Sequence, residues 1–296
     1  MKKILCFLLL LFLPSFLLAA EPLSIVTTTV DLAAISKAVA GERVKVESIA
    51  KGFQDPHYVE AKPSYMRLVN QARLLFYVGL QLEIGWLPLL VQGARNPTLV
   101  KVDLSQGISV LERPAGPISR AQGDIHPEGN PHYWLDPRNG VLMARRIAQE
   151  LKALAPNDGA AFEQNLKLFE SDLSQRRQKW EERMMPFRGV EVVVYHKQWE
   201  YLANWLGVPI IGYVEDKPGI PPSPQHMANL IRTMQQKKIK ALWVANFTNP
   251  AISQSVAEKG GAKMVVLPAS VGGEKMIESY GDLFDSIIGK LAEAHR

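Results

Sequence analysis

Three of the six histidines stand in local settings that favour metal binding. His57 follows Asp55-Pro56, His132 follows Asn130-Pro131, and His196 ends the apolar run VVVYH. They are separated by 75 residues (132 minus 57) and 64 residues (196 minus 132). These long separations exclude a short-range zinc-finger pattern. A site made of these three side chains would therefore have to be assembled by the fold.

Three neutral imidazole nitrogens would suit zinc, which needs no redox chemistry, whereas manganese is expected to draw on more carboxylate oxygen. Each histidine alone is also compatible with an ordinary hydrogen-bonded surface residue, because histidine is a common metal ligand without usually being one. The remaining histidines have weaker claims. His126 lies in a loop, His226 lies on a predicted helix face, and His295 lies at the C-terminus.

The first half of the chain alternates β-branched runs with helical segments. Strands are predicted over 23–29, 44–49, 74–78 and 99–102, and helices over 32–40, 63–71 and 140–154. This rhythm predicts a parallel sheet covered by helices. Residues 112–131 interrupt it with prolines and glycines and are predicted to form a loop or flap.

The second half repeats the pattern after a long charged helix with one apolar stripe, predicted over 162–185. Strands are predicted over 190–195, 208–213, 241–245 and 264–267, and helices over 196–206, 225–236, 250–260 and 276–294. We predict an α/β fold with two lobes, each a mostly parallel sheet with flanking helices, joined by one long linking helix. The predicted limits are 21–159, 160–186 and 187–296.

The first twenty residues have the build of a cleavable secretory signal peptide. Two lysines precede an apolar run that ends on Ala19-Ala20 and is short for a membrane span. Cys6, the only cysteine, lies inside this segment and not at its cleavage point, so it is not predicted to carry a lipid anchor. The mature chain would then contain no cysteine, and a periplasmic protein without disulfides is predicted. Without the two lysines the net charge falls from +5 to +3, with no basic stripe for nucleic acid.

Five segments make the chain resemble the zinc and manganese solute-binding proteins of ABC importers. They are DPHYVEAKPSY (55–65), NPHYWLDP (130–137), YHKQWEYLANWLG (195–207), GYVEDKPGIPPSP (212–224) and GGAKMVVLP (260–268). The resemblance covers almost the whole mature chain. It implies two α/β lobes with a rigid linking helix, metal ligands at His57, His132 and His196, and delivery of the ion to an inner-membrane permease by a monomer. Histidine at the third position implies the zinc subgroup.

The resemblance leaves the fourth ligand open. Relatives often supply a carboxylate after the last strand, where this chain has small residues over 270–273, so Glu274 or water are the candidates. Residues that could orient a ligand histidine are Glu60, Asp136 and Glu215. The histidine-rich loop of the family is reduced here to His126, for which a scavenging role is therefore doubtful.

Three alternatives stay open at this stage. Three histidines and a water on zinc would also make a hydrolytic site, but no motif such as HExxH supplies a general base, so no enzyme is predicted. An extracellular adhesin or interaction protein is the second alternative. The third keeps the transport role and changes the metal to manganese, iron or copper.

Overall fold

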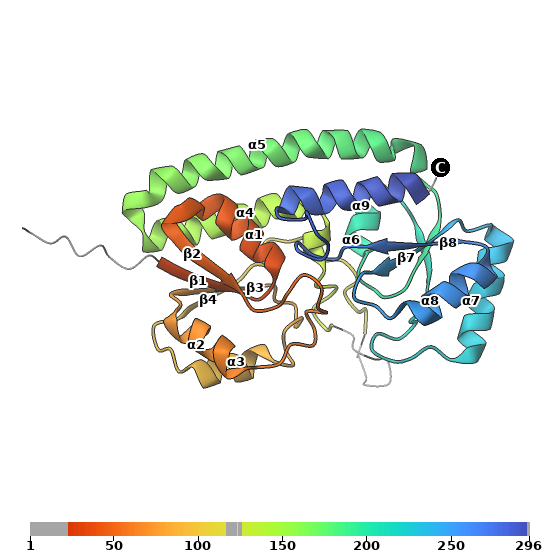
Figure 1. The fold of residues 1–296 in the computed structure, drawn as a ribbon, viewed down its shortest axis with the longest axis horizontal. Coiled ribbons are helices and arrows are strands. Elements are labelled where there is room, and N and C mark those ends of the chain that lie inside the picture. The colour runs from red at the N-terminus through yellow and green to blue at the C-terminus, as the bar shows by residue number, and fades with distance from the viewer. Residues whose placement is uncertain (1–22, 117–122, 124–125, 295–296) are drawn as a thin grey trace, which may run out of the picture.

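The computed structural model describes residues 23–116, 123 and 126–294, and Figure 1 shows two α/β units side by side. The predicted signal peptide and His295 lie outside these residues. Within the described ranges, no helix combines the length and apolar character that are needed to cross a membrane.

The first unit contains a sheet of four parallel strands in the order β2-β1-β3-β4. Its strands are β1 (Leu23–Thr27), β2 (Val44–Ser48), β3 (Leu74–Tyr77) and β4 (Val100–Asp103). Its helices are α1 (Val30–Ala40), α2 (Pro63–Gln71), α3 (Leu87–Ala94) and α4 (Pro137–Leu154). The predicted parallel sheet is therefore present, and α3 is a helix that the sequence pattern did not reveal.

The two faces of this sheet are buried in different cores, because neighbouring residues of a strand point to opposite sides. Ile25 and Leu74 lie in the core that includes α1 and α4, whereas Val26 and Leu75 lie in the core of α2 and α3. This packing explains why the central strands β1 and β3 are nearly continuous apolar runs, whereas the edge strands β2 and β4 contain charged residues.

The second unit has the same strand order, β6-β5-β7-β8, and is again parallel. Its strands are β5 (Val192–Val194), β6 (Ile210–Tyr213), β7 (Ala241–Ala245) and β8 (Lys263–Leu267). Its helices are α6 (Glu200–Leu206), α7 (Pro224–Lys237), α8 (Pro250–Gly260) and α9 (Tyr280–Ala294). In each sheet the first strand lies between the second and the third, so successive connections leave it in opposite directions. Ligands of open α/β sheets bind beside such a reversal point.

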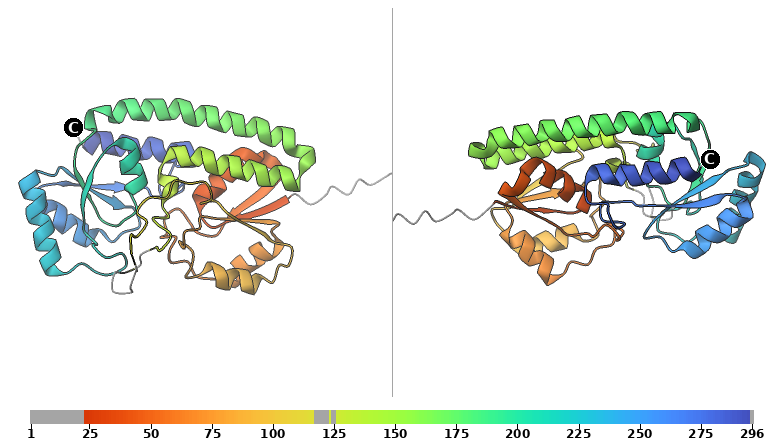
Figure 2. Two further views of the ribbon diagram at one scale, coloured as in Figure 1. Left: turned by 180° about the vertical axis from the view of Figure 1, so that it is seen from behind. Right: turned by 45° about the horizontal axis from the view of Figure 1, so that its top comes forward.

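One helix of 26 residues, α5 (Gly159–Met184), runs along both units (Figures 1 and 2). It packs on α1 and α4 of the first unit and on α9, which follows the second sheet. The largest apolar core is continuous through this region and includes buried residues of both sheets, such as Phe76 and Trp243. This shared core ties the two units together.

The predicted fold class is confirmed, with small differences at element boundaries. One difference of four residues concerns His196, which was predicted to begin a helix. It lies instead in a turn between β5 and α6, and α6 begins at Glu200. Trp199 at the helix start is fully buried, so the turn places this aromatic side chain in the core before the helix begins.

Candidate metal centre

The fold brings His57, His132 and His196 together from three different connections. His57 follows β2, His132 precedes α4, and His196 follows β5 at the reversal point of the second sheet. One ring nitrogen from each lies within 4.8 Å of the other two. The ring centroids are 5.1 Å apart for His57 and His132, and 5.9 Å apart for each pair with His196. Side chains from both units thus face a common point.

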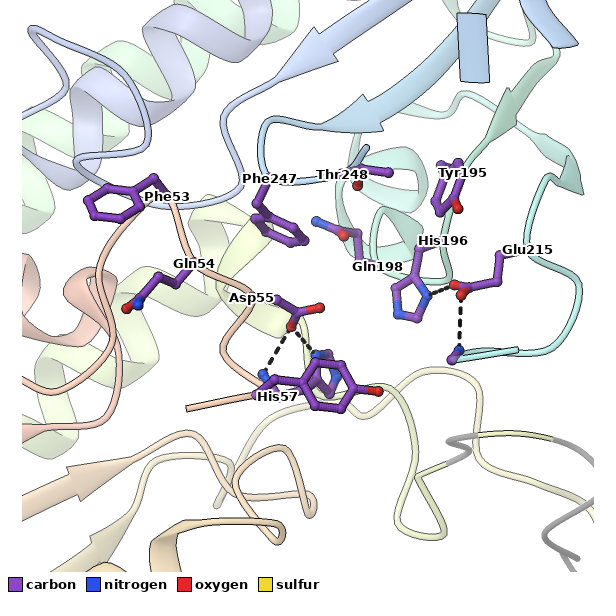
Figure 3. A pocket seen from close by; sticks show the side chains of 12 residues that line it. Phe53, Gln54, Asp55, His57, Tyr195, His196, Gln198, Glu215, Phe247 and Thr248 are labelled. Atoms are coloured by element: carbon purple, nitrogen blue, oxygen red, sulfur yellow. Dashed lines mark hydrogen bonds and ion pairs between the residues drawn. The ribbon is translucent and has the colours of Figure 1, made fainter. Parts of the chain in front are cut away.

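His57 is oriented by the aspartate two residues before it. Asp55 Oδ1 accepts a hydrogen bond from the backbone N–H of His57 at 3.0 Å and lies 2.7 Å from His57 Nδ1. Asp55 thereby forms a turn with its own main chain and fixes the ring at the same time. Pro56 between them restricts the backbone at this turn. Figure 3 shows both contacts of this carboxylate.

His132 repeats the arrangement with an amide in place of the carboxylate. Asn130 Oδ1 accepts from the His132 backbone N–H at 3.0 Å and lies 2.9 Å from His132 Nδ1. The Nδ2 group of Asn130 donates to Lys197 O at 3.1 Å and to Glu200 Oε2 at 3.0 Å. Asn130 therefore connects His132 to the segment that follows His196.

His196 is held by a residue from the next strand connection. Its Nδ1 lies 2.5 Å from Glu215 Oε2, just after β6. The other oxygen of Glu215 accepts from the backbone N–H of Gly219 at 3.1 Å, so the carboxylate is itself held in place (Figure 3). Of the three orienting residues that the sequence suggested, this is the one that contacts a histidine.

All three histidines share one consequence of these contacts. An oxygen acceptor at Nδ1 favours the tautomer with the proton on Nδ1 and leaves the Nε2 lone pair for a metal. The site therefore offers three nitrogen donors that are already oriented. Within the described residues, the group of potential ligands that lie this close together contains no carboxylate.

Burial tunes the charges at this site. His132 is only 3% exposed, and burial, followed by the charges of His57 and His196, lowers its pKa well below 6.5. Burial alone would raise the pKa of Asp55, but its hydrogen bond to His57 and the charge of His57 outweigh that effect and hold the pKa below its ordinary value. Metal binding requires a free lone pair on the ring, and the lowered pKa of His132 favours the neutral form that has one.

The site lies in a cavity of about 390 Å³ between the two units. His57 and His196 line it together with aromatic side chains, among them Phe53, Tyr195 and Phe247 (Figure 3). His132 is more deeply buried than His57 and His196. An ion entering the cavity would meet these two rings before that of His132.

The other predicted orienting residues lie elsewhere. The Glu60 side chain is 79% exposed and lies near Lys62, and Asp136 caps α4 and pairs with Arg138. Asp55 and Asn130, which do contact the rings of His57 and His132, were missed in these roles. The signal was present in the sequence as the repeated pattern Asx-Pro-His at 55–57 and 130–132.

The candidate fourth position after β8 has a different role in the structure. Glu274 Oε1 accepts from Lys290 Nζ at 2.8 Å, which directs this carboxylate toward α9. In the loop before it, the Val271 N–H donates to the buried Asp31 Oδ1 at 2.9 Å. This loop therefore joins the second unit to α1.

Two further histidines can be placed. His226 lies at the start of α7, and its Nε2 atom lies 2.8 Å from Tyr213 O, so its ring contacts the main chain of the second unit. His126 lies against His57, with their Nε2 atoms 3.1 Å apart. The predicted flap around it has no helix or strand in its described part.

Comparison with protein families gives a match over residues 25–294 to the family described as zinc-uptake complex component A, periplasmic (ZnuA). Among individual relatives, the metal ABC transporter substrate-binding lipoprotein FimA of Streptococcus parasanguinis is 29% identical over 287 residues, 93% of this chain and 90% of FimA. The manganese ABC transporter substrate-binding lipoprotein PsaA of Streptococcus pneumoniae is 28% identical over 290 residues, 93% of this chain and 89% of PsaA.

Solved structures share the fold. A crystal structure of ZnuA superposes with a TM-score of 0.80 at 24% identity and covers 93% of this chain and all of that chain. A manganese-bound periplasmic metal-binding protein from Candidatus Liberibacter asiaticus gives a TM-score of 0.77 at 19% identity, covering 92% of this chain and 98% of its own. Two units bridged by a long helix are therefore a recurring architecture.

Proposed function

Because this chain belongs to the family of periplasmic zinc-uptake components A, we propose that its cargo is zinc and that His57, His132 and His196 bind the ion. The protein is the metal-binding, substrate-binding component of an ABC importer and not an enzyme. Substrate-binding proteins of this kind work on the outer side of the membrane and deliver the metal to a permease.

One observation carries the choice of zinc, namely the donor set. Three rings converge within 4.8 Å, and each has an oxygen acceptor at Nδ1. Neutral imidazole nitrogens suit zinc, whereas manganese favours carboxylate oxygen. Because the acceptors hold the rings before any metal binds, little side-chain entropy is lost on binding.

The continuous core supports a mode of capture with little movement of the lobes. We propose lobes over 21–159 and 187–296 with a linking helix over 160–186, whose contacts with α1, α4 and α9 oppose a wide hinge opening. We further propose that the mature chain is a periplasmic monomer exported with a cleavable signal peptide; FimA and PsaA are named as lipoproteins.

Calorimetric titration of the metal-free mature protein with ZnCl₂ and MnCl₂ tests the proposal. We expect one zinc per chain and weaker manganese binding. His196→Ala should weaken zinc binding by about 1,000-fold, because losing one of a few ligands removes roughly a third of a zinc binding energy of ~10–16 kcal/mol. His226→Ala is the matched control and should bind zinc like the wild type, because its ring contacts Tyr213 O.

Manganese is the second candidate cargo, because PsaA is named as a manganese transporter component and one structural neighbour is manganese-bound. Tighter binding of manganese than of zinc would change the cargo and keep the transport role. Unchanged zinc binding by His196→Ala would reject the three-histidine site itself.

A further inference from the structure

The ring of His126 lies against the metal-facing side of His57. The two Nε2 atoms are 3.1 Å apart, and the ring centroids are 5.2 Å apart with an angle of 31° between the planes. His57 Nδ1 is engaged by Asp55, so the nitrogen that His126 faces is the one left for a metal. His126 therefore contacts the proposed site at a ligand atom.

This separation matches that of two ligands on one zinc ion. With Zn–N distances of 2.0–2.1 Å and tetrahedral geometry, two ligand nitrogens lie about 3.3–3.4 Å apart. The observed 3.1 Å differs from this by a few tenths of an ångström. Without metal, the same separation suits an N–H···N hydrogen bond, in which a proton takes the place of the ion between the two nitrogens.

Described contacts on both sides place His126 at this position. Its carbonyl accepts from the Gly129 N–H at 3.1 Å, which closes a turn, and Glu128 of the same turn accepts from Gln81 Nε2 at 3.3 Å. On the other side, Gly123 has φ of +88° and approaches the second lobe so closely that a Cβ there would lie 2.3 Å from Pro218 O. Residues 126–129 thus contact the first lobe, and Gly123 lies against the second.

We propose that His126 is the fourth zinc ligand and that it sets the preference of this chain for zinc over manganese. The inference rests on the proposed three-histidine site. His126 itself lies outside the group of three whose nitrogens are mutually within 4.8 Å, and it reaches that group through His57. Among the described residues that group includes no carboxylate, so a fourth nitrogen would complete an all-imidazole set that manganese disfavours.

The test compares the wild type, His126→Ala and the control His226→Ala in zinc and manganese titrations against a competing chelator. We expect His126→Ala to weaken zinc binding by roughly 10- to 100-fold, at least the effect of losing a group that supports a metal ligand. Manganese binding should change by less than about threefold, because water oxygen replaces the ring at little cost for that ion. His126→Asp should shift the preference toward manganese.

X-ray absorption spectroscopy of the zinc-loaded wild type provides a reading that needs no variant. Four imidazoles per zinc are expected, and three in His126→Ala. Three imidazoles in the wild type, or equal losses of zinc and manganese affinity in His126→Ala, would overturn the proposal. The three-histidine site would survive that outcome if His196→Ala still loses zinc, so the two proposals fail separately.

Discussion

The two halves of the proposed metal centre orient their histidines by different means. In the first half, His57 and His132 each bond an acceptor two residues earlier in the chain. In the second half, His196 bonds Glu215, which is 19 residues later and follows a different strand. The first arrangement is complete within three consecutive residues, whereas the second depends on the pairing of β5 with β6, in which Val194 lies beside Tyr213.

This difference shows which part of the site is sensitive to its surroundings. A local turn keeps its geometry as long as its own backbone is intact. A ring held by a distant carboxylate keeps its geometry only while both strands stay in register. We therefore expect orientation at His196 to be the more easily disturbed, and the predictions below test this expectation in order of decreasing effect.

Among the contacts that orient the histidines, removal of the distant acceptor should have the largest effect. Glu215→Ala leaves His196 Nδ1 without its carboxylate and frees the Gly219 N–H, so ring and loop lose their common anchor. We expect zinc binding to weaken by up to about 100-fold, the upper range for a group that orients a ligand. Chelator competition measures this, with Glu60→Ala as control because Glu60 is exposed. An affinity equal to that of the wild type would show that His196 needs no such anchor.

Glu200 links the two halves through Asn130, and its charge makes that link pH-dependent. Burial raises the pKa of Glu200 from 4.5 to about 6. A raised acid pKa means that folding disfavours the ionised form. The free energy of unfolding of the wild type therefore falls as pH rises from about 4.5 through about 6. Over this rise in pH, the stability of metal-free Glu200→Gln should increase by roughly 2 kcal/mol relative to that of the wild type.

Chemical denaturation of both metal-free proteins at pH 4.5 and pH 7 measures this difference. Comparing variant with wild type at each pH cancels the opposite contribution of His132, whose lowered pKa costs stability as pH falls. A stability difference that is the same at both pH values would mean that Glu200 is not disfavoured as an anion.

Changing each local acceptor into the other type, amide or carboxylate, should show that the two are not equivalent. Asp55→Asn keeps an oxygen for His57 and should cost less than about threefold in zinc affinity, because only charge is lost. Asn130→Asp puts a second carboxylate beside the buried Glu200 and loses the N–H donated to it, so we expect about a tenfold loss. Equal affinities in titrations of the two variants would contradict this asymmetry.

The same contrast explains how much the sequence could predict. The alternation of apolar strands and helices predicts the parallel sheets, and the Asx-Pro-His pattern at 55–57 and 130–132 contains the local acceptors within the sequence itself. The contact of His126 with His57 depends on how the segment between the lobes is held, which no local pattern contains. The turn at His196 likewise follows from burial of Trp199, which is a tertiary effect.

The smallest effect is expected at Glu274, the carboxylate that follows the small residues 270–273 after the last strand. Its carboxylate pairs with Lys290 at 2.8 Å on α9, and the pair is about one-third exposed. Glu274→Gln should leave zinc affinity within about twofold and reduce stability by less than ~1 kcal/mol, as for a partly exposed ion pair. Titration and thermal melting of the metal-free protein measure both. A tenfold loss of zinc affinity would instead make Glu274 the fourth ligand and would compete directly with His126.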